Sequence, residues 1–334
     1  MKHNDIDFNN KKILVTGGAG FIGSNLVFYF QDNYPSADIY VFDCFRSDEK
    51  FPNGNLKSFG HYENLIGFKG KIICGNINSP KDLKALEEIK FDYIFHQAAI
   101  SDTRVYDQEI IFKTNINSFY WFLEKTKKDG AVIVYASSAA TYGSLSAPQV
   151  VGKERPENPY GYSKYAMDQI AQSFSNQNPE LKIIGLRFFN VYGPREYFKA
   201  KTSSMVIQLG HQILSGTAPR LFINSDRIER DFIYIDDVIQ ANVRACEASR
   251  NGVYNVGSGT SRSFQDVADI LQKEFSTSYP TEYFENPYSG YQEYTLADIS
   301  ASKKYLNFSP QFSLEVGISE YIKNIRDMFN YPIN

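Results

Sequence analysis

The sequence predicts an α/β protein built on a doubly wound parallel sheet with a smaller C-terminal domain. Short apolar runs recur through the first 190 residues, and longer amphipathic stretches separate several of them. Buried strands that alternate with helices are typical of a parallel sheet with helices on both faces. After Phe189 this alternation stops, and segments rich in Gly, Pro, Ser and Tyr follow. A chain of 334 residues is long enough for two closely associated domains.

The individual elements are predicted from apolar runs and amphipathic stretches. Strands are expected at residues 12–16, 39–42, 71–74, 93–96, 131–135 and 182–188, and helices at 21–33, 80–89, 109–128 and 160–175. In the second part we expect mostly loops, with helices at 205–214 and 264–274. The apolar run at 253–256 is expected to rejoin the sheet as a further strand.

The first predicted strand ends in a glycine-rich loop, Gly17-Gly18-Ala19-Gly20-Phe21-Ile22-Gly23, which has GxxGxxG spacing and leads directly into a helix. Glycines at these places permit a tight turn, close approach of a pyrophosphate and close packing of helix on strand. The helix N-terminus adds N–H donors and positive potential. Asp43 closes the second strand about 20 residues further on, where an acid that binds ribose is expected. The pattern therefore favours a Rossmann fold that binds a nicotinamide dinucleotide over a purely structural turn.

The domain division and the choice of cofactor follow from this loop. We assign residues 1–190 to an NAD(P)-binding Rossmann domain, with about 232–257 returning to it, and residues 191–334 to a discontinuous substrate-binding domain. Asp43 would accept hydrogen bonds from a ribose diol, which favours NAD. Arg46 and Lys50 follow closely and would neutralise a 2′-phosphate, although solvated loop charges are an equal alternative. We predict NADP, with NAD as the alternative.

Tyr160 and Lys164 form a YxxxK pair on the helix predicted at 160–175. Residues four apart share a helix face, so the ammonium lies beside the phenol. A free tyrosine titrates at about 10, and a nearby positive charge brings its pKa toward the working range of a base. Ser138 follows a predicted strand and would hydrogen-bond the reacting oxygen. These three side chains predict a redox site, with a coincidental surface pair as the alternative.

Several segments together carry a resemblance to a known enzyme family. TGGAGFIG, YASSAATYG, YGYSK, residues 189–196 and residues 230–234 are similar to extended short-chain dehydrogenases/reductases that act on nucleotide sugars. More narrowly, SSAATYG, NVYGPRE with Lys199 after it, and Gly290-Tyr291-Gln292 resemble the ADP-L-glycero-D-manno-heptose 6-epimerases. The likeness extends from about Lys12 to Asp298.

The resemblance implies roles for residues across the chain. Tyr160 and Lys199 would be two opposed acid/bases, with Ser138 as their helper and Lys164 on the cofactor ribose. The cofactor-binding residues would be Gly17, Gly20, Phe21, Ile22, Gly23, Asp43, Cys44, Arg46, Lys50, Gln97, Ala98, Ala99, Asn115, Lys164 and Val191. The substrate-binding residues would be Ser101, Asn190, Lys201, Gln208, Phe222, Ser225, Arg230 and Tyr291. The 4 histidines and 3 cysteines lack the spacing of a metal site, so no metal is expected.

The implied reaction inverts C6 of an ADP-bound heptose through a transient ketone, with the hydride passing to NADP and returning to the other face. Inversion needs a proton donor on each side of the carbon, which explains the need for Lys199. A 4-epimerase is the alternative, because it needs Ser138, Tyr160 and Lys164 but not Lys199. A 4,6-dehydratase is disfavoured, since Ala139 and Ala140 stand where such relatives carry an Asp-Glu pair. A catalytically silent binding protein would usually have lost the Tyr or the Lys.

The composition argues against other partners. A net charge of −3 gives no basic field for nucleic acid or anionic lipid. No apolar run is long enough to cross a bilayer, and the first ten residues lack a signal-peptide core. The cysteines are far apart, as expected of reduced thiols in a cytoplasmic protein. The resemblance further implies a homo-oligomer, with a pentamer among the expected assemblies, that serves lipopolysaccharide heptose synthesis.

Overall fold

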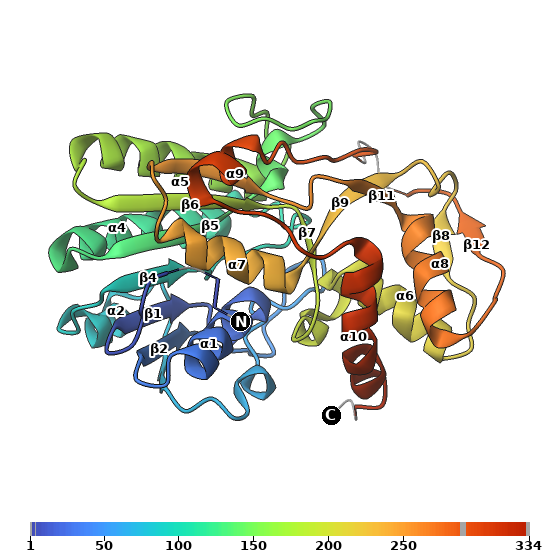
Figure 1. Ribbon diagram of the computed structural model, residues 1–334, viewed down its shortest axis with the longest axis horizontal. Helices are drawn as coiled ribbons and strands as arrows, with labels where there is room; N and C mark the ends of the chain where they lie inside the picture. Colours follow the sequence, from blue (N-terminus) through green and yellow to red (C-terminus); the bar gives the residue numbers. More distant parts are fainter. Residues whose placement is uncertain (1, 4, 288–291, 332–334) are drawn as a thin grey trace.

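The computed structural model describes residues 2–3, 5–287 and 292–331. A parallel sheet lies at its centre (Figure 1). Within the described residues this sheet has seven strands in the order β10-β6-β5-β4-β1-β2-β3. The order of the strands along the chain reverses between β1 and β4, and doubly wound proteins bind their ligands at such a switch point. The predicted doubly wound α/β fold is confirmed.

Every predicted strand of this sheet is present. Its strands are β1 (Lys12–Thr16), β2 (Asp38–Asp43), β3 (Lys71–Cys74), β4 (Tyr93–His96), β5 (Val132–Ser138), β6 (Lys182–Phe188) and β10 (Gly252–Val256). The return of the chain at 253–256 is confirmed, because β10 pairs in parallel with β6. The assignment of whole domains stays a prediction, since one cluster of buried apolar side chains extends from the sheet into the C-terminal part.

Helices cover both faces of the sheet (Figure 1). On one face, Ile13 and Val15 share a buried cluster with side chains of α1 (Phe21–Asn33) and α7 (Ile235–Ala245). On the other face, Leu14 belongs to a second cluster. The helices of that face are α2 (Pro80–Glu87), α4 (Ser118–Asp129) and α5 (Pro159–Gln177). Successive residues of β1 thus point to opposite helix layers, which is why its sequence is a continuous apolar run.

The single helix expected at 109–128 is interrupted. The chain forms α3 (Gln108–Phe112), a π-helical turn (Lys113–Asn117) and then α4. In that turn Asn115 is fully buried. Its side chain accepts a hydrogen bond from the Ile100 backbone N–H (2.9 Å) and donates to the Ile100 carbonyl (3.0 Å). A π-helical turn commonly marks a functional site, and this one fixes the loop that follows β4.

The C-terminal part contains smaller sheets and a group of helices (Figure 1). β7 (Asn190–Tyr192), β9 (Glu229–Tyr234) and β11 (Ser261–Ser263) form one sheet, and β8 (Arg220–Phe222) pairs with β12 (Glu282–Phe284). The predicted helices appear as α6 (Met205–Leu214) and α8 (Phe264–Phe275), and both contact α10 (Leu314–Phe329). The remaining short helices in the described residues are η1 (Tyr62–Leu65), η3 (Ala139–Tyr142), η4 (Tyr197–Thr202) and α9 (Ser300–Leu306).

The expectation that loops dominate after residue 189 is wrong, because α7, α9 and α10 lie there as well. Helix α10 buries Leu314, Ile318, Tyr321 and Ile325 on one face, a helical period that is visible in the sequence. Ser313 caps it by accepting a hydrogen bond from the Val316 N–H. Helix α7 was missed although its polar residues Asp236, Gln240 and Arg244 recur at helical spacing. Among the described residues, no helix is both long and apolar enough to cross a membrane.

Candidate active site

A cleft of about 1190 Å³ opens where the strand order reverses. Its walls come from the carboxyl ends of β1, β2, β4 and β5, from the start of α5, and from β7, η4 and β9 of the C-terminal part. The predicted site residues that line it are Gly17, Gly20, Phe21, Ile22, Gly23, Asp43, Cys44, Gln97, Ala98, Ala99, Ser101, Ser138, Tyr160, Lys164, Asn190, Val191, Lys199 and Arg230. Residues far apart in the sequence therefore meet in one site.

The glycine loop at one end of the cleft fits the diphosphate of a dinucleotide. Gly17 has φ +68°, and a Cβ there would lie 2.8 Å from the backbone nitrogen of Ala98. A Cβ on Gly23 would lie 2.2 Å from the Gly17 carbonyl oxygen, so this glycine lets α1 pack closely on the loop. Gly20 caps α1 without a side chain, and the first turn holds no acid. The positive end of the helix therefore faces the cleft without a neutralising group of its own.

Asp43 ends β2 at the position expected of a ribose-binding acid, but its carboxylate already has partners. One oxygen accepts from the Ala19 N–H (3.0 Å) and the other from the Phe45 N–H (2.8 Å). Burial raises the pKa of Asp43. Arg46 and Lys50 are both exposed, and neither contributes to the described lining of the cleft. Asp43 thus ties the glycine loop to the end of β2.

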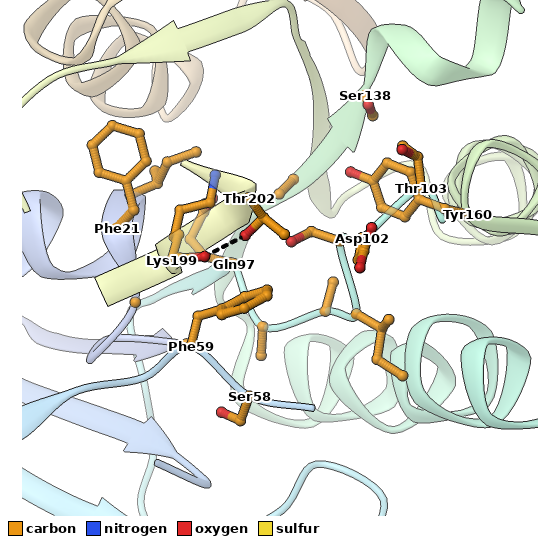
Figure 2. A pocket seen from close by; sticks show the side chains of 18 of the residues that line it. Phe21, Ser58, Phe59, Gln97, Asp102, Thr103, Ser138, Tyr160, Lys199 and Thr202 are labelled. Carbon is orange, nitrogen blue, oxygen red and sulfur yellow. Dashed lines mark hydrogen bonds between the residues drawn. The ribbon is translucent and has the colours of Figure 1, made fainter. Parts of the chain in front are cut away.

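Ser138 and Tyr160 meet on one wall of the cleft (Figure 2). Ser138 ends β5, and its hydroxyl accepts from the Ala140 N–H (3.1 Å). Tyr160 lies in the first turn of α5, where Asn158 caps the helix by accepting from the Gly161 N–H (2.8 Å). A Cβ on Gly161 would lie 2.4 Å from the Ala140 carbonyl oxygen, so a glycine is needed for this close approach. The strand end and the helix start therefore bring the two hydroxyls together.

The electrostatics of Tyr160 differ from the sequence prediction. Burial raises its pKa, and a hydrogen bond with Ser138 partly opposes this rise. Lys164 donates to the Ala136 carbonyl (2.8 Å), and its ammonium lies 6.0 Å from the centre of the Tyr160 ring. Burial lowers the pKa of Lys164 to about 8, while the charge of Asp168 raises it. In the protein alone, therefore, Tyr160 is a neutral phenol that can donate a proton.

Lys199 lies on the opposite side of the cleft from Tyr160, beside Phe21 of the glycine loop (Figure 2). It belongs to η4, and its ammonium is 5.5 Å from the centre of the Phe21 ring. The residue is half-buried. Burial lowers the pKa of Lys199, and the charge of Glu196 opposes that effect. Two titratable side chains of different chemistry, a phenol and an amine, thus face one cleft from two walls.

The predicted substrate residues are only partly brought together. Ser101, Asn190 and Arg230 line the cleft, and Arg230 is buried with hydrogen bonds to the carbonyls of Glu229 and Gln292. Outside the described lining lie Lys201, Gln208, Phe222 and Ser225, as does Asn115 of the cofactor set. Gln208 donates to the Ser203 carbonyl (2.7 Å), and Asn115 to the Ser163 hydroxyl (2.9 Å). Tyr291 lies outside the described residues. The roles of these residues stay predictions.

Several polar residues that line the cleft were not predicted from the sequence. Asp102 and Thr103 line the cleft, and Figure 2 draws both together with Tyr160. Asp102 is buried, and its carboxylate accepts hydrogen bonds from the side chains of Asn53 and Asn55. These bonds hold the loop after β2 against the loop after β4. The sequence could have indicated these residues, because both loops follow the carboxyl ends of strands near the switch point.

Comparisons with known proteins agree with this geometry. The profile of the NAD dependent epimerase/dehydratase family matches residues 13–257. The structure of Helicobacter pylori ADP-L-glycero-D-manno-heptose-6-epimerase is 46% identical in sequence, covers 98% of this chain and 99% of that chain, and superposes with a TM-score of 0.90.

More distant likenesses share the same fold. UDP-glucose 4-epimerase from Thermotoga maritima, solved with UDP-glucose, is 28% identical over 96% of this chain and 100% of that chain, with a TM-score of 0.85. UDP-glucuronic acid 4-epimerase from Bacillus cereus, solved with UDP-glucuronic acid and NAD, is also 28% identical. It covers 95% of this chain and 99% of that chain, with a TM-score of 0.80.

Proposed function

The chain belongs to the NAD dependent epimerase/dehydratase family, and we propose that it is an ADP-L-glycero-D-manno-heptose 6-epimerase. The observation that carries this proposal is the placement of Tyr160 and Lys199 on opposite walls of one cleft. A proton-transfer group on one wall would reach the hydroxyl of only one epimer, whereas groups on two opposite walls would reach the hydroxyls of both. The 46% identity with the Helicobacter pylori enzyme supports the choice of substrate.

Several residues of the chain would take part in the inversion, each with a different role. When bound, a nicotinamide dinucleotide supplies the hydride acceptor and donor for this chemistry. The glycine loop and the N-terminus of α1 would hold its diphosphate. Ser138 would hydrogen-bond the hydroxyl oxygen of one epimer, while Tyr160 takes or returns its proton. Lys199 would do the same for the other epimer from the opposite wall.

Substrate recognition would use the remaining polar groups of the cleft. Arg230 places a guanidinium in the wall formed by β9, where it would bind a diphosphate. Asn190 and Ser101 are exposed in the cleft and would contact sugar hydroxyls. Ala139 and Ala140 also line the cleft. Methyl groups at these places cannot remove a carbon-bound proton, which argues against a dehydratase.

We further propose NADP as the cofactor. Both carboxylate oxygens of Asp43 accept backbone N–H groups, which makes them less available to a ribose diol. Arg46 and Lys50 are exposed close to the end of β2, where they would attract a 2′-phosphate. Denaturing the purified protein and identifying the released nucleotide tests this proposal. Recovery of NAD alone would show that Asp43 sets the preference.

The cellular setting is proposed on the same grounds. The family resemblance supports a homo-oligomer, with a pentamer among the candidates, in the synthesis of lipopolysaccharide heptose. The free thiols of Cys44, Cys74 and Cys246 support a cytoplasmic location. Sedimentation of the cofactor-bound protein would measure the oligomer size, and a single monomeric species would contradict this part of the proposal.

One experiment tests the proposed reaction directly. The protein is incubated with ADP-D-glycero-D-manno-heptose, and separately with UDP-glucose, and the products are resolved by NMR. We expect interconversion of the two C6 epimers and no change in UDP-glucose. Turnover of UDP-glucose alone would instead identify a 4-epimerase. Loss of water from either sugar would contradict epimerisation altogether.

A further inference from the structure

Lys199 sits on a loop whose backbone needs outside support. The loop spans residues 193–204, between β7 and α6. Arg195 has φ +75° and Ala200 has φ +50°, so two residues with side chains adopt the left-handed region on either side of Lys199. Such conformations persist only where surrounding contacts impose them. The position of the Lys199 ammonium therefore depends on whatever holds this loop.

Glu196 provides that support from inside the loop. Its side chain is fully buried. One carboxylate oxygen accepts from the Gly193 N–H (3.1 Å) and from the Ser204 hydroxyl (2.8 Å), and the other accepts from the Ser204 N–H (2.6 Å). Gly193 begins the loop and Ser204 is the N-cap of α6. A single carboxylate thus joins both ends of the segment that carries Lys199.

Glu196 and Lys199 are also coupled directly. The Lys199 N–H donates to the Glu196 carbonyl (2.9 Å), so the two residues lie in one turn. The charge of Glu196 opposes the lowering of the Lys199 pKa by burial, and Lys199 opposes the raising of the Glu196 pKa by burial. Removing either charge would increase the free-energy cost of burying the other.

Buried phenols and a histidine pack around this loop from other elements, and Arg195 and Lys201 are basic residues of the loop itself. Burial raises the pKa values of Tyr192 of β7 and Tyr321 of α10, and the charges of Glu196 and the neighbouring Tyr234 of β9 raise them further. The His61 ring stacks on Phe198, 3.8 Å between centres, and burial lowers its pKa. Asp237 and Glu315 also act on Tyr192, while the charge that acts on Lys199 is that of Glu196.

We propose that Glu196 is a positioning residue, whose buried carboxylate closes the 193–204 loop and presents the Lys199 ammonium to the cleft. It would not touch the substrate, since three donors from the loop ends occupy its oxygens. The inference rests on the proposed function, because that function makes Lys199 one of two acid/bases. It adds a residue that governs the position and the acidity of that base.

The test substitutes Glu196→Gln in the full-length, cofactor-bound protein. Lysines are acetylated with trace acetic anhydride between about pH 6 and about pH 11, and the Lys199 and Lys164 peptides are quantified by mass spectrometry. Loss of the negative charge should lower the midpoint for Lys199 by about one pH unit or more and leave Lys164 unchanged. With ADP-heptose as substrate, kcat should fall on the order of 10²-fold, with KM changed less than about threefold.

Two further variants separate charge from structure. Ser204→Ala keeps the carboxylate but removes one donor, so it should lower kcat less and leave the Lys199 midpoint in place. Glu320→Gln removes an exposed acid next to Tyr321 and should change neither quantity. All variants are first checked for the wild-type melting profile.

The outcomes distinguish this inference from the proposed function. If the wild-type protein does not epimerise ADP-heptose, the proposed function fails, but the labelling midpoint needs no substrate and still tests Glu196. A folded Glu196→Gln protein with the wild-type midpoint for Lys199 would overturn the inference. An equal fall in the Lys164 midpoint would also overturn it, because it would indicate a general loss of structure.

Discussion

The two walls of the cleft hold the residues that we propose as proton-transfer groups in different ways. Ser138, Tyr160 and Lys164 stand on β5 and α5, elements of the central layers. Beneath them, Asp168 accepts from the Tyr135 and Ser137 hydroxyls (3.0 and 2.9 Å) and pairs with Arg187 (2.8 Å). Lys199 instead stands on a loop whose ends are joined by Glu196. One wall is fixed by regular structure and the other by a few buried polar contacts.

This difference predicts whether a substitution in each wall affects mainly stability or mainly catalysis. Asp168 and Arg187 are almost completely buried and join α5 to both β5 and β6, so their loss affects the whole fold. The 193–204 loop contributes less to the sheet, so changes there should alter catalysis before they alter stability. The following predictions test this contrast, from the largest expected effect to the smallest.

The largest effect is expected from Tyr160→Phe on the regular wall. The variant should fold and keep its cofactor but lose about two to four orders of magnitude in kcat, the usual contribution of a positioned acid/base. Turnover and released nucleotide are measured on the same preparation. The matched control is Tyr162→Phe, an exposed tyrosine on the same helix. Near wild-type turnover by Tyr160→Phe in both directions would remove Tyr160 from the mechanism.

Asp168→Asn tests the buried support of the same wall. Breaking a buried pair typically costs about 3–5 kcal/mol in unfolding free energy. We expect about 3 kcal/mol, because Glu154 still contacts Arg187 (2.5 Å). Urea denaturation measures the change. The control, Asp327→Asn, breaks an exposed pair with Lys323 and should change stability by less than about 0.5 kcal/mol. Equal effects in both variants would show that the regular wall does not depend on its buried charges.

The two walls also differ in how far the sequence predicts them. Tyr160 and Lys164 are recognisable because their spacing is set by one helix, and the glycine loop because local geometry demands its residues. Lys199 was named only through the family resemblance, since its position depends on contacts with Gly193 and Ser204 that no local pattern encodes. The helices after residue 189 were predicted in part: α6 and α8 were expected, whereas α7, α9 and α10 were missed although the helical period of α10 is visible in the sequence.

Lys199→Met tests the loop wall. We expect kcat to fall on the order of 10²-fold with nucleotide binding largely intact, because one of the two proton-transfer groups is lost. The urea midpoint should stay at the wild-type value, in contrast to Asp168→Asn. Lys127→Met is the control, since Lys127 is exposed on α4 and lies outside the described lining of the cleft. A change in KM alone would make Lys199 a binding residue rather than an acid/base.

The smallest effect is expected in deuterium oxide, where the product should gain no carbon-bound deuterium. In the proposed mechanism both walls exchange only hydroxyl protons, through Tyr160 on one side and Lys199 on the other. The hydrogen on the inverted carbon leaves as hydride and returns as hydride, so it does not exchange with solvent. A mechanism through an enolate would need a group that deprotonates carbon, and the cleft presents the methyl groups of Ala139 and Ala140 where such a group would stand.

Mass spectrometry of the product decides between these mechanisms. We expect no carbon-bound deuterium after many turnovers, while the hydroxyl positions exchange freely and are washed back in water. As a control for detection, the same substrate is labelled with deuterium at C6 and followed in ordinary water, where the label should be retained. Incorporation of about one deuterium per turnover would contradict direct oxidation at the inverted carbon. It would also overturn the assignment of Tyr160 and Lys199 to proton transfer at the hydroxyl oxygen.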